Sequence, residues 1–290
     1  MGGRSTITVL GAGPSVLSEA FELARRCERL WSRFLPASDL SRLNWSEGVP
    51  TVVDPLTTRL VQAMVDGHRL SFGLFDPTLL PDLIAAGYAR SAVDEGRRTT
   101  LPGSARSPGD LGAIRIEGDV ITLPRGTVLD PGGIGKGLAA DIVCESVLAA
   151  GALGAMAEFS GDIVVAGGSP EGLGWRIGVE NPIRPELHVA IVAVQSGAIV
   201  TSSQRKRRWQ VEGKDAHHLI DPATHSSILT DVQSVTVIAG TGWYAETLSK
   251  AGFLMDPAEY LRWLPTVAAA GAIVDSSGAL QVSSNWQEYS

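Results

Sequence analysis

The sequence predicts an α+β fold in which a largely antiparallel sheet is flanked by helices. Three observations lead to this prediction. Apolar residues at helical spacing occur mainly in the first 150 residues and return near residue 243. Between these regions, short apolar or alternating runs are separated by turn residues, which is typical of antiparallel strands. Glycine and proline are scattered along the 290 residues without forming a linker, so we expect one domain over residues 1–290.

The first part of the chain holds most of the expected helices. An alternating run at 5–10 predicts a strand, and the apolar spacing that follows predicts a helix over 14–34. A polar loop at 35–46 separates this helix from a second one over 55–72. Residues 111–129 have the pattern of a β-hairpin.

The segment LDPGGIGKGLAAD, residues 129–141, is expected to turn from a strand into a helix that runs to about Ala150. Glycines at a helix N-terminus expose backbone N–H groups, which together with the helix dipole favour an anion such as a diphosphate. Lys136 adds a positive charge there. The same glycines also fit a tight turn that needs positive φ or close packing and binds nothing. The P-loop motif is excluded because Gly137 stands where that motif needs a hydroxyl.

The second part of the chain reads mainly as strands. Six short runs between residues 156 and 240 predict strands, and helices are expected at 243–255 and 258–264. A hairpin with its turn at 276–278 is expected to end the pattern.

The composition is that of a globular protein, with 44% hydrophobic and 19% charged residues. A net charge of −7 argues against a nucleic-acid partner. No window is apolar enough to span a membrane and the N-terminus lacks a secretory pattern, so we expect a cytoplasmic protein unless a leader has been removed. Cys27 and Cys144 lie in helical patterns and are expected to be small core residues.

Several longer blocks occur in a fixed order: WSRFLPASDLSRLN (31–44), FDPTLLPDLIAAGY (75–88), LDPGGIGKGLAAD, FSGDIVVAGG (159–168), TSS followed by Arg208-Trp209, HHLIDPATH (217–225) and SVTVIAGTGWYAETLSKAGFLMD (234–256). This series resembles the ApbE-type flavin transferases, which are FAD:protein FMN transferases. The resemblance implies a single ApbE-like domain that binds FAD. It also implies a magnesium-dependent reaction that splits the FAD diphosphate, attaches FMN to a Thr or Ser hydroxyl of an acceptor protein and releases AMP.

For the flavin nucleotide, the resemblance points to aromatic, apolar, acidic and glycine residues from four of these blocks, together with the lysine of the glycine turn: Phe34, Leu74, Phe75, Asp76, Gly132, Gly133, Lys136, Leu138 and Ile220. Three of them also have ordinary structural explanations. Phe34 fits core packing, Asp76 fits the cap of a helix that starts at Pro77, and Lys136 fits a solvated lysine in the first turn of a helix.

For the cation, the resemblance implies a backbone carbonyl, matched here by Gly135, and an Asp and a Thr four residues apart. Glu246 and Lys250 stand at those two positions. Residues four apart share one helix face, so Glu246 and Lys250 are also expected to form an ion pair. Either Glu246 binds Mg2+ with water, the Gly135 carbonyl and phosphate oxygens, or the Lys250 ammonium replaces the metal as counter-charge.

For the proton transfer, the resemblance points to His218 as general base towards the acceptor hydroxyl, with Asp221 orienting or assisting it. His225 stands where the family usually has glycine, so an altered turn is expected there. Two other functions remain open at this stage: a flavin-binding or flavin-delivery protein without catalysis, and a hydrolase that uses water as the acceptor.

Overall fold

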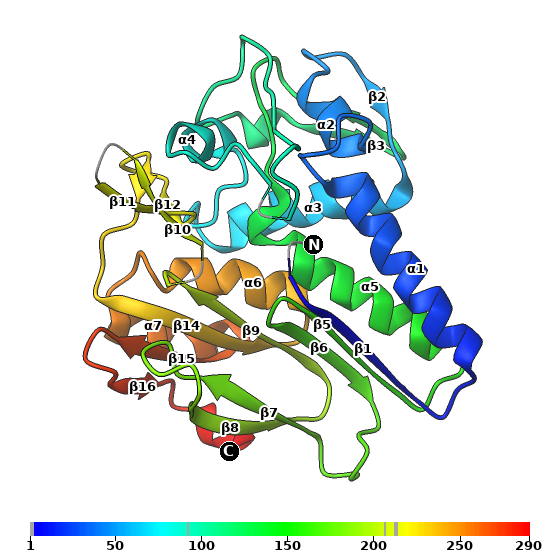
Figure 1. Ribbon diagram of the computed structural model, residues 1–290, viewed down its shortest axis with the longest axis vertical. Coiled ribbons are helices and arrows are strands. Elements are labelled where there is room, and N and C mark those ends of the chain that lie inside the picture. The colour runs from blue at the N-terminus through cyan, green and yellow to red at the C-terminus, as the bar shows by residue number, and fades with distance from the viewer. Residues whose placement is uncertain (1–2, 92, 206, 212–213) are drawn as a thin grey trace. The chain divides into compact units, whose positions relative to one another are not determined.

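The computed structural model describes residues 3–91, 93–205, 207–211 and 214–290 (Figure 1). By its internal contacts the chain divides into two compact units, and each is described by itself. The first unit comprises Arg25–Gly135 and Arg207–Ile228. The second comprises Gly3–Ala24, Lys136–Lys206 and Leu229–Ser290.

A seven-stranded sheet forms the centre of the second unit, and every pair of neighbouring strands in it is antiparallel. The strand order is β1-β5-β6-β9-β14-β15-β16. The strands are β1 (Ser5–Leu10), β5 (Gly154–Phe159), β6 (Asp162–Gly167), β9 (Gly197–Ser203), β14 (Val232–Ala239), β15 (Ala270–Asp275) and β16 (Leu280–Val282). The predicted antiparallel sheet and the α+β class are thereby confirmed.

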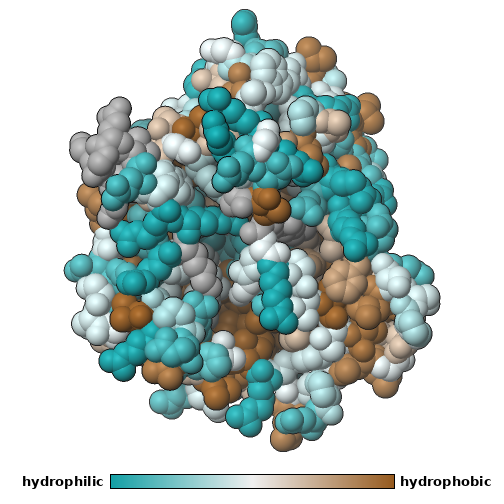
Figure 2. Space-filling model, in the orientation of Figure 1, coloured by the Kyte–Doolittle hydropathy of each residue, from teal (hydrophilic) through white to brown (hydrophobic). Residues whose placement is uncertain are grey.

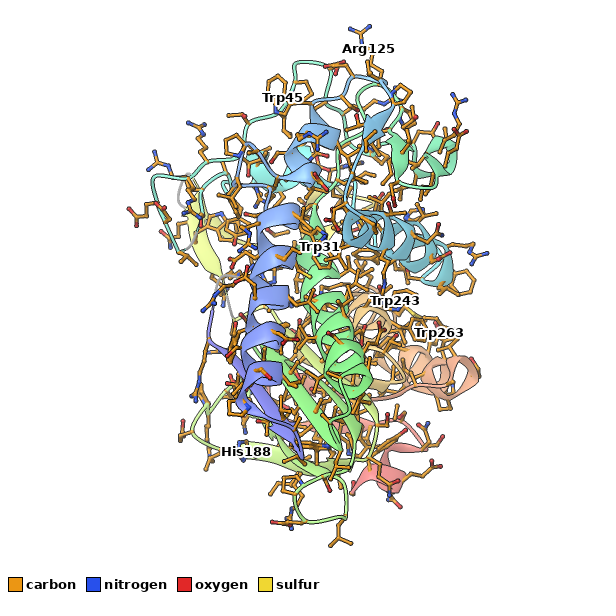
Figure 3. All side chains as sticks on the ribbon, turned by 90° about the vertical axis from the view of Figure 1, so that its right-hand side faces the viewer. Trp31, Trp45, Arg125, His188, Trp243 and Trp263 are labelled. Atoms are coloured by element: carbon orange, nitrogen blue, oxygen red, sulfur yellow. The ribbon has the colours of Figure 1, made fainter. Side chains whose placement is uncertain are left out.

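Other elements of the second unit cover both faces of this sheet. Because successive side chains of a strand point to opposite faces, the strands contribute apolar side chains to both contacts. One face carries α5 (Gly135–Ala149), α6 (Gly242–Ala251) and α7 (Pro257–Trp263), which continues into the 3-10 helix η3 (Leu264–Val267). In the side view of Figure 3, Trp243 and Trp263 mark α6 and α7. The other face packs against the hairpin β7 (Trp175–Glu180) and β8 (His188–Val194) and against η4 (Trp286–Tyr289).

The first unit contains short helices and small sheets. Its helices are the second part of α1 (Pro14–Trp31), α2 (Asp39–Asn44), α3 (Pro55–Leu70), α4 (Leu80–Ala85) and the 3-10 helices η1 (Leu111–Ala113) and η2 (Pro131–Gly133). Its strands are β2 (Thr51–Val52), β4 (Val120–Thr122) and β3 (Arg115–Glu117) in one sheet, and the hairpins β10 (Arg208–Val211) with β11 (Lys214–His217) and β12 (Ile220–Asp221) with β13 (Ser226–Ser227).

Three sequence predictions need correction in the first unit. The segment 35–46 is not a plain loop but contains α2, because the Ser38 side chain caps the helix and Leu40 and Leu43 are buried. The helix predicted to reach residue 34 ends at Trp31. The hairpin predicted to begin at residue 111 begins only at Arg115, after η1. Residues 212–213, the end of one predicted strand run, lie outside the described residues.

The side chains of Cys27 and Cys144 are buried, with 0% and 2% of their surface exposed, as the sequence predicted. On the face drawn in Figure 2, hydrophilic residues predominate and hydrophobic residues occur in small groups. Within the described residues, the helices are too short or too polar to cross a lipid bilayer.

Candidate functional site

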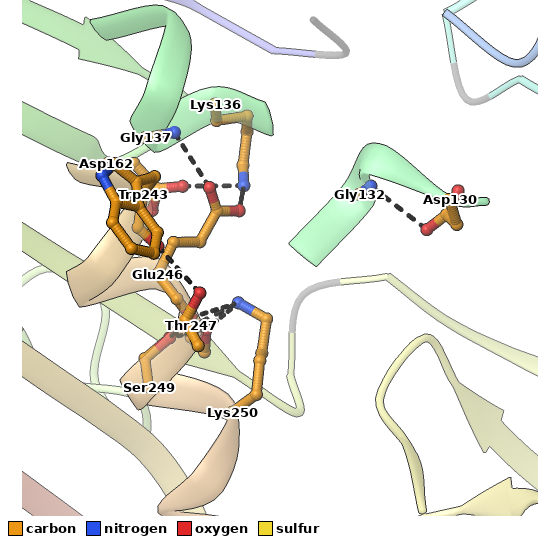
Figure 4. Close-up of polar contacts among 11 residues, drawn as sticks. Asp130, Gly132, Lys136, Gly137, Asp162, Trp243, Glu246, Thr247, Ser249 and Lys250 are labelled. Carbon is orange, nitrogen blue, oxygen red and sulfur yellow. Dashed lines mark hydrogen bonds and ion pairs between the residues drawn. The ribbon is translucent and has the colours of Figure 1, made fainter. Parts of the chain in front are cut away.

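A cluster of buried charges lies in the second unit, where α5, α6 and β6 meet (Figure 4). Lys136, in the first turn of α5, forms ion pairs with Glu246 of α6 and with Asp162 of β6, the second at 2.7 Å. The other carboxylate oxygen of Glu246 accepts a hydrogen bond from the Gly137 N–H at 2.9 Å. Glu246 is fully buried, whereas 20% of the Lys136 side chain is exposed.

These contacts set the charge states of the cluster. Burial acts to lower the pKa of Lys136, but Asp162 and Glu246 outweigh it and raise this pKa above its ordinary value. Burial acts to raise the pKa of Glu246, but Lys136 and Lys250 outweigh it, so the pKa ends below its ordinary value. For Asp162, burial prevails over the attraction of Lys136 and the pKa is raised. Lys136 and Glu246 are therefore charged at neutral pH.

Lys250 lies one turn after Glu246 on α6, as the sequence spacing requires. Its ammonium nitrogen donates to Ser202 Oγ at 2.7 Å, and it lies 3.4 Å from both Ser249 Oγ and the backbone carbonyl oxygen of Glu246. Ser202 and Ser249 are themselves hydrogen-bonded at 2.7 Å. The ammonium thus sits among neutral oxygens, and its charge also acts on the Glu246 carboxylate.

Two features of α5 hold α6 in place. The carboxylate of Asp141 accepts hydrogen bonds from the N–H groups of Gly242 and Trp243, at 2.7 and 3.0 Å, and so caps the N-terminus of α6. Gly137 lies against Gly242 so closely that a Cβ atom built on Gly137 would be 2.3 Å from the Gly242 backbone. The two helix backbones therefore touch, and this contact brings Lys136 within reach of Glu246.

Of the explanations that the sequence left open for the glycine turn, the structure supports close packing at one position and gives no support to positive φ. No glycine of residues 132–137 in the structure has a positive φ, so the left-handed conformation does not explain them. Close packing does explain Gly137. The N–H groups of Gly132 and Gly137 donate to Asp130 and Glu246, which means that carboxylates of the protein already occupy two of the amides expected to bind a diphosphate. Gly133 ends η2, and Gly135 begins α5.

A magnesium ion does not fit these residues as they are arranged. Mg2+ requires a near-octahedral set of oxygen ligands. Both carboxylate oxygens of Glu246 already have partners. At position 250, where the family has Thr, the Lys250 ammonium contacts the oxygen atoms nearby, namely Ser202 Oγ and the Glu246 carbonyl oxygen. Among the described residues, no three His, Cys, Asp or Glu side chains are grouped so that they could hold a metal.

In the first unit, an arginine and three aromatic rings form a second cluster. The buried Arg33 pairs with Asp130 at 2.9 Å, and its guanidinium lies over the rings of Phe34 and Tyr88, at 4.2 and 4.9 Å from their centroids. Tyr88 stacks on Trp209 with centroids 5.4 Å apart. Sequence reasoning singled out Phe34 but missed Arg33, Tyr88 and Trp209. The signal was present, since all three lie in or beside blocks that carry the family resemblance.

The residues of the FDP block have structural roles. Phe75 is buried in the core and Leu74 is partly buried. The Asp76 carboxylate accepts hydrogen bonds from the N–H and the hydroxyl of Thr78, at 2.7 and 2.6 Å. It therefore shapes the turn before α4, but not as the cap of a helix beginning at Pro77, because α4 begins at Leu80. Leu138, on α5 of the second unit, is also a core residue.

The paired histidines of the first unit differ in their surroundings. His217 is buried, with Nε2 3.0 Å from the carbonyl oxygen of Ile228 and Nδ1 accepting from the Leu219 N–H. Burial lowers the pKa of His217, so the ring is neutral and structural. His218 is only partly buried, and its Nδ1 atom is shielded from solvent.

The residues after His218 form a turn. Ile220 and Asp221 make up β12, and the Asp221 carboxylate accepts a hydrogen bond from the Ala223 N–H at 2.8 Å. His225 follows with a φ of +55°, a conformation that glycine adopts without strain. Its Nδ1 atom lies 2.8 Å from the Asp82 carboxylate. A glycine would adopt this conformation without strain, and His225 adopts it here with Asp82 as its side-chain partner.

Comparison with known proteins gives concordant results. A model of the ApbE family matches residues 1–273. The FAD:protein FMN transferase of Treponema pallidum is 28% identical over 264 residues, which is 83% of this chain and 71% of the relative. The enzyme of the same name from Vibrio cholerae is 27% identical over 233 residues, or 77% of this chain and 68% of the relative.

Solved structures show the same fold. The ApbE protein of Thermotoga maritima superposes with a TM-score of 0.83 at 24% identity, over 98% of this chain and 94% of that one. The flavin transferase ApbE from Vibrio cholerae gives a TM-score of 0.80 at 22% identity, over 100% of this chain and 96% of that one.

Proposed function

The chain belongs to the ApbE family, and from this membership we propose that it is an FAD:protein FMN transferase. The reaction forms a bond between the acceptor hydroxyl oxygen and the FMN phosphorus. It breaks the diphosphate bond to the AMP phosphate, which leaves as AMP. The single observation that carries the proposal is the family match over residues 1–273 together with curated relatives that bear this name.

The charge cluster supports the proposal by its chemistry. A diphosphate carries negative charge on its non-bridging oxygens, and its cleavage gains from fixed positive charge nearby. Lys136 remains charged, lies in the first turn of α5 and keeps part of its side chain exposed. We assign the diphosphate to this lysine, which then exchanges part of its pairing with Asp162 and Glu246 for phosphate oxygens.

For the acceptor we propose the Thr or Ser hydroxyl of another protein, with His218 as the general base. Because Nδ1 of His218 is shielded from solvent, Nε2 is the atom assigned to receive the proton. Asp221 supports this role by shaping the turn that follows His218. The other residues that the resemblance implies remain proposed contacts of FAD: Phe34, Leu74, Phe75, Asp76, Gly132, Gly133, Leu138 and Ile220. The cytoplasmic location likewise remains a prediction.

The magnesium ion implied by the resemblance has no step in this mechanism, because the residues present do not fit it. When bound, such an ion would supply positive charge to the phosphate oxygens. In this chain Gly135, Glu246 and Lys250 stand at the matching positions, and two of them already form the contacts described above.

The test is incubation of the full chain with FAD and a candidate acceptor protein, followed by measurement of AMP and of covalently bound flavin. We expect AMP and labelled acceptor in equal amounts. AMP with free FMN and no labelled protein would indicate hydrolysis instead, and intact FAD under all conditions would indicate a binding protein.

The variant His218→Gln is expected to lower labelling by about a hundredfold or more, which is the usual contribution of a general base. The matched control is His188→Gln, since His188 is exposed on β8 (Figure 3). Equal labelling by both variants would remove His218 from the mechanism.

A further inference from the structure

The ammonium group of Lys250 occupies a cage of oxygen atoms on α6 and β9. It donates to Ser202 Oγ at 2.7 Å and approaches the Glu246 carbonyl oxygen and Ser249 Oγ, both at 3.4 Å. Hydroxyl and carbonyl oxygens are also ligands that a hard divalent cation would use. The Lys250 ammonium therefore lies among oxygen atoms of the kind that would ligate a metal ion.

The charges of the cluster balance without a metal ion. Lys136 and Lys250 are positive, and Glu246 and Asp162 are their negative counterparts. A divalent ion added to these four groups would meet two ammonium groups in a buried environment, where repulsion is weakly screened. With threonine at position 250, one of those positive charges would be missing.

We propose that the Lys250 ammonium takes the place of a divalent cation, so that this protein binds and cleaves the FAD diphosphate without a metal ion. The inference rests on the proposed function for its cleavage step. In that step the bond changes are those given above. A lysine ammonium supplies a compact positive charge with three N–H donors, which suits phosphate oxygens.

The first test is metal binding, which needs no turnover. Electron paramagnetic resonance of Mn2+ is measured with the full chain, with and without FAD, for four proteins. These are the wild type, Lys250→Thr, the double variant Lys250→Thr with Glu246→Asp, and the charge-matched control Arg176→Thr. Arg176 is exposed on β7, in the same unit. We expect the wild type and the control to leave Mn2+ free and the double variant to bind it when FAD is present.

The second test is AMP release in EDTA or in Mg2+. The wild type is expected to give rates within about twofold of each other, whereas Lys250→Thr should lose at least about tenfold in EDTA and recover with Mg2+.

Two results would overturn the proposal. One is EDTA-sensitive turnover of the wild type that Mg2+ restores. The other is equal Mn2+ binding by the wild type and the double variant, whether both bind or neither does. If no protein releases AMP under any condition, the proposed function fails, and the Mn2+ measurement still decides whether Lys250 excludes a metal. The comparison of EDTA with Mg2+ uses the wild type alone, so it still tests the proposal if a variant does not fold; the Mn2+ comparison is made only with variants whose circular dichroism matches the wild type.

Discussion

Lys136 and Glu246 form a buried ion pair, and a pair of this kind contributes to stability only while both partners are present. Glu246 is fully buried, so removal of the Lys136 charge leaves a carboxylate without its main counter-ion. We expect such a pair to fix the position of α5 relative to α6, and not to add much to the net free energy of folding.

We expect Lys136→Met and Glu246→Gln each to lower the free energy of unfolding by about 3 kcal/mol, and the double variant to lower it by clearly less than the sum. Urea denaturation of all four proteins gives the coupling energy. The control is the exposed pair Asp66 and Arg69 on α3, at 3.1 Å, for which we expect a coupling of about 0.5 kcal/mol or less. Strictly additive effects at Lys136 and Glu246 would contradict the pairing.

His217 makes a second residue-level prediction, on acid stability. Burial first, and then the charge of Arg208, lower its pKa below the ordinary value of 6.5, opposed by the Ile228 carbonyl. The folded state therefore favours the neutral ring, and the unfolded state binds more protons as the pH falls below about 6.5. Below about pH 6.5, His217 is thus expected to lower the free energy of unfolding by up to about 1.4 kcal/mol for each unit that the pH falls.

The measurement is urea denaturation between pH 7.5 and 5 on wild type and His217→Gln, whose amide keeps a donor for Ile228. The wild type should lose more stability on acidification than the variant does. Parallel pH profiles would show that His217 does not titrate as described.

Among single residues, the sequence identified Lys136, Glu246 and Lys250, and the structure places all three near one another. It did not identify Asp162, although this residue lies in the block FSGDIVVAGG, because its partner Lys136 is 26 positions earlier on a different element. The expected side-chain pairing of Glu246 with Lys250 followed from helix spacing alone. Spacing could not reveal that Lys136, from another helix, would take the Glu246 carboxylate.

At the level of elements, α6 depends on a cap from a distant part of the chain. Its own N-cap residue, Thr241, makes no side-chain hydrogen bond to the helix, and Asp141 of α5 supplies the carboxylate instead. Asp141 is the last residue of the LDPGGIGKGLAAD segment. The same segment thus provides both the lysine that binds Glu246 and the carboxylate that fixes the helix carrying Glu246.

We expect Asp141→Ala to lower the free energy of unfolding by about 2 kcal/mol, because it leaves the buried N–H of Gly242 and the partly buried N–H of Trp243 without their acceptor. It should also lower AMP release, since Glu246 and Lys250 both move with α6. The control is Asp256→Ala, which removes the cap of α7 and should cost about 1 kcal/mol with unchanged AMP release. Equal effects of both variants on AMP release would argue against Asp141 as a positioning residue.

Most helices and strands follow from the apolar pattern, with ends that differ by a few residues. The helix predicted over 55–72 is α3, which ends at Leu70 because Phe72 and Gly73 adopt positive φ. The short α2 was missed because six residues are too few for a periodic pattern. At His225 the resemblance indicated an unusual turn, but histidine itself gives no sign of the αL conformation that the structure shows.

For the whole molecule, the sequence predicted an antiparallel sheet but not its strand order. β1 pairs with β5, about 150 residues later in the chain, and lies at one edge of the sheet. Alternating patterns show that a run is a strand, but they carry no information on which distant run becomes its neighbour. The single-domain prediction is also a statement about the whole chain, and the two cysteines allow a direct test of it.

Cys27 belongs to the first unit and Cys144 to the second, and burial raises the pKa of each thiol to about 12. Neither thiol should react with a thiol reagent at pH 8 in the native protein, because the thiolate is the reactive form. If the chain unfolds as one domain, pulse labelling across a urea titration should expose both cysteines at the same midpoint, as peptide mass spectrometry would show. Two separate midpoints would divide the chain into independently folding parts.

The contact between Gly137 and Gly242 has a consequence for how this sequence can vary. Each position tolerates hydrogen alone as a side chain, because the neighbouring backbone fills the space that a methyl group would need. We therefore expect homologues to conserve the two glycines together, since a larger residue at one position cannot be offset by a smaller residue at the other. Homologues that replace either glycine should show a wider gap between the helices and a rearranged set of charges, even when every charged residue is retained.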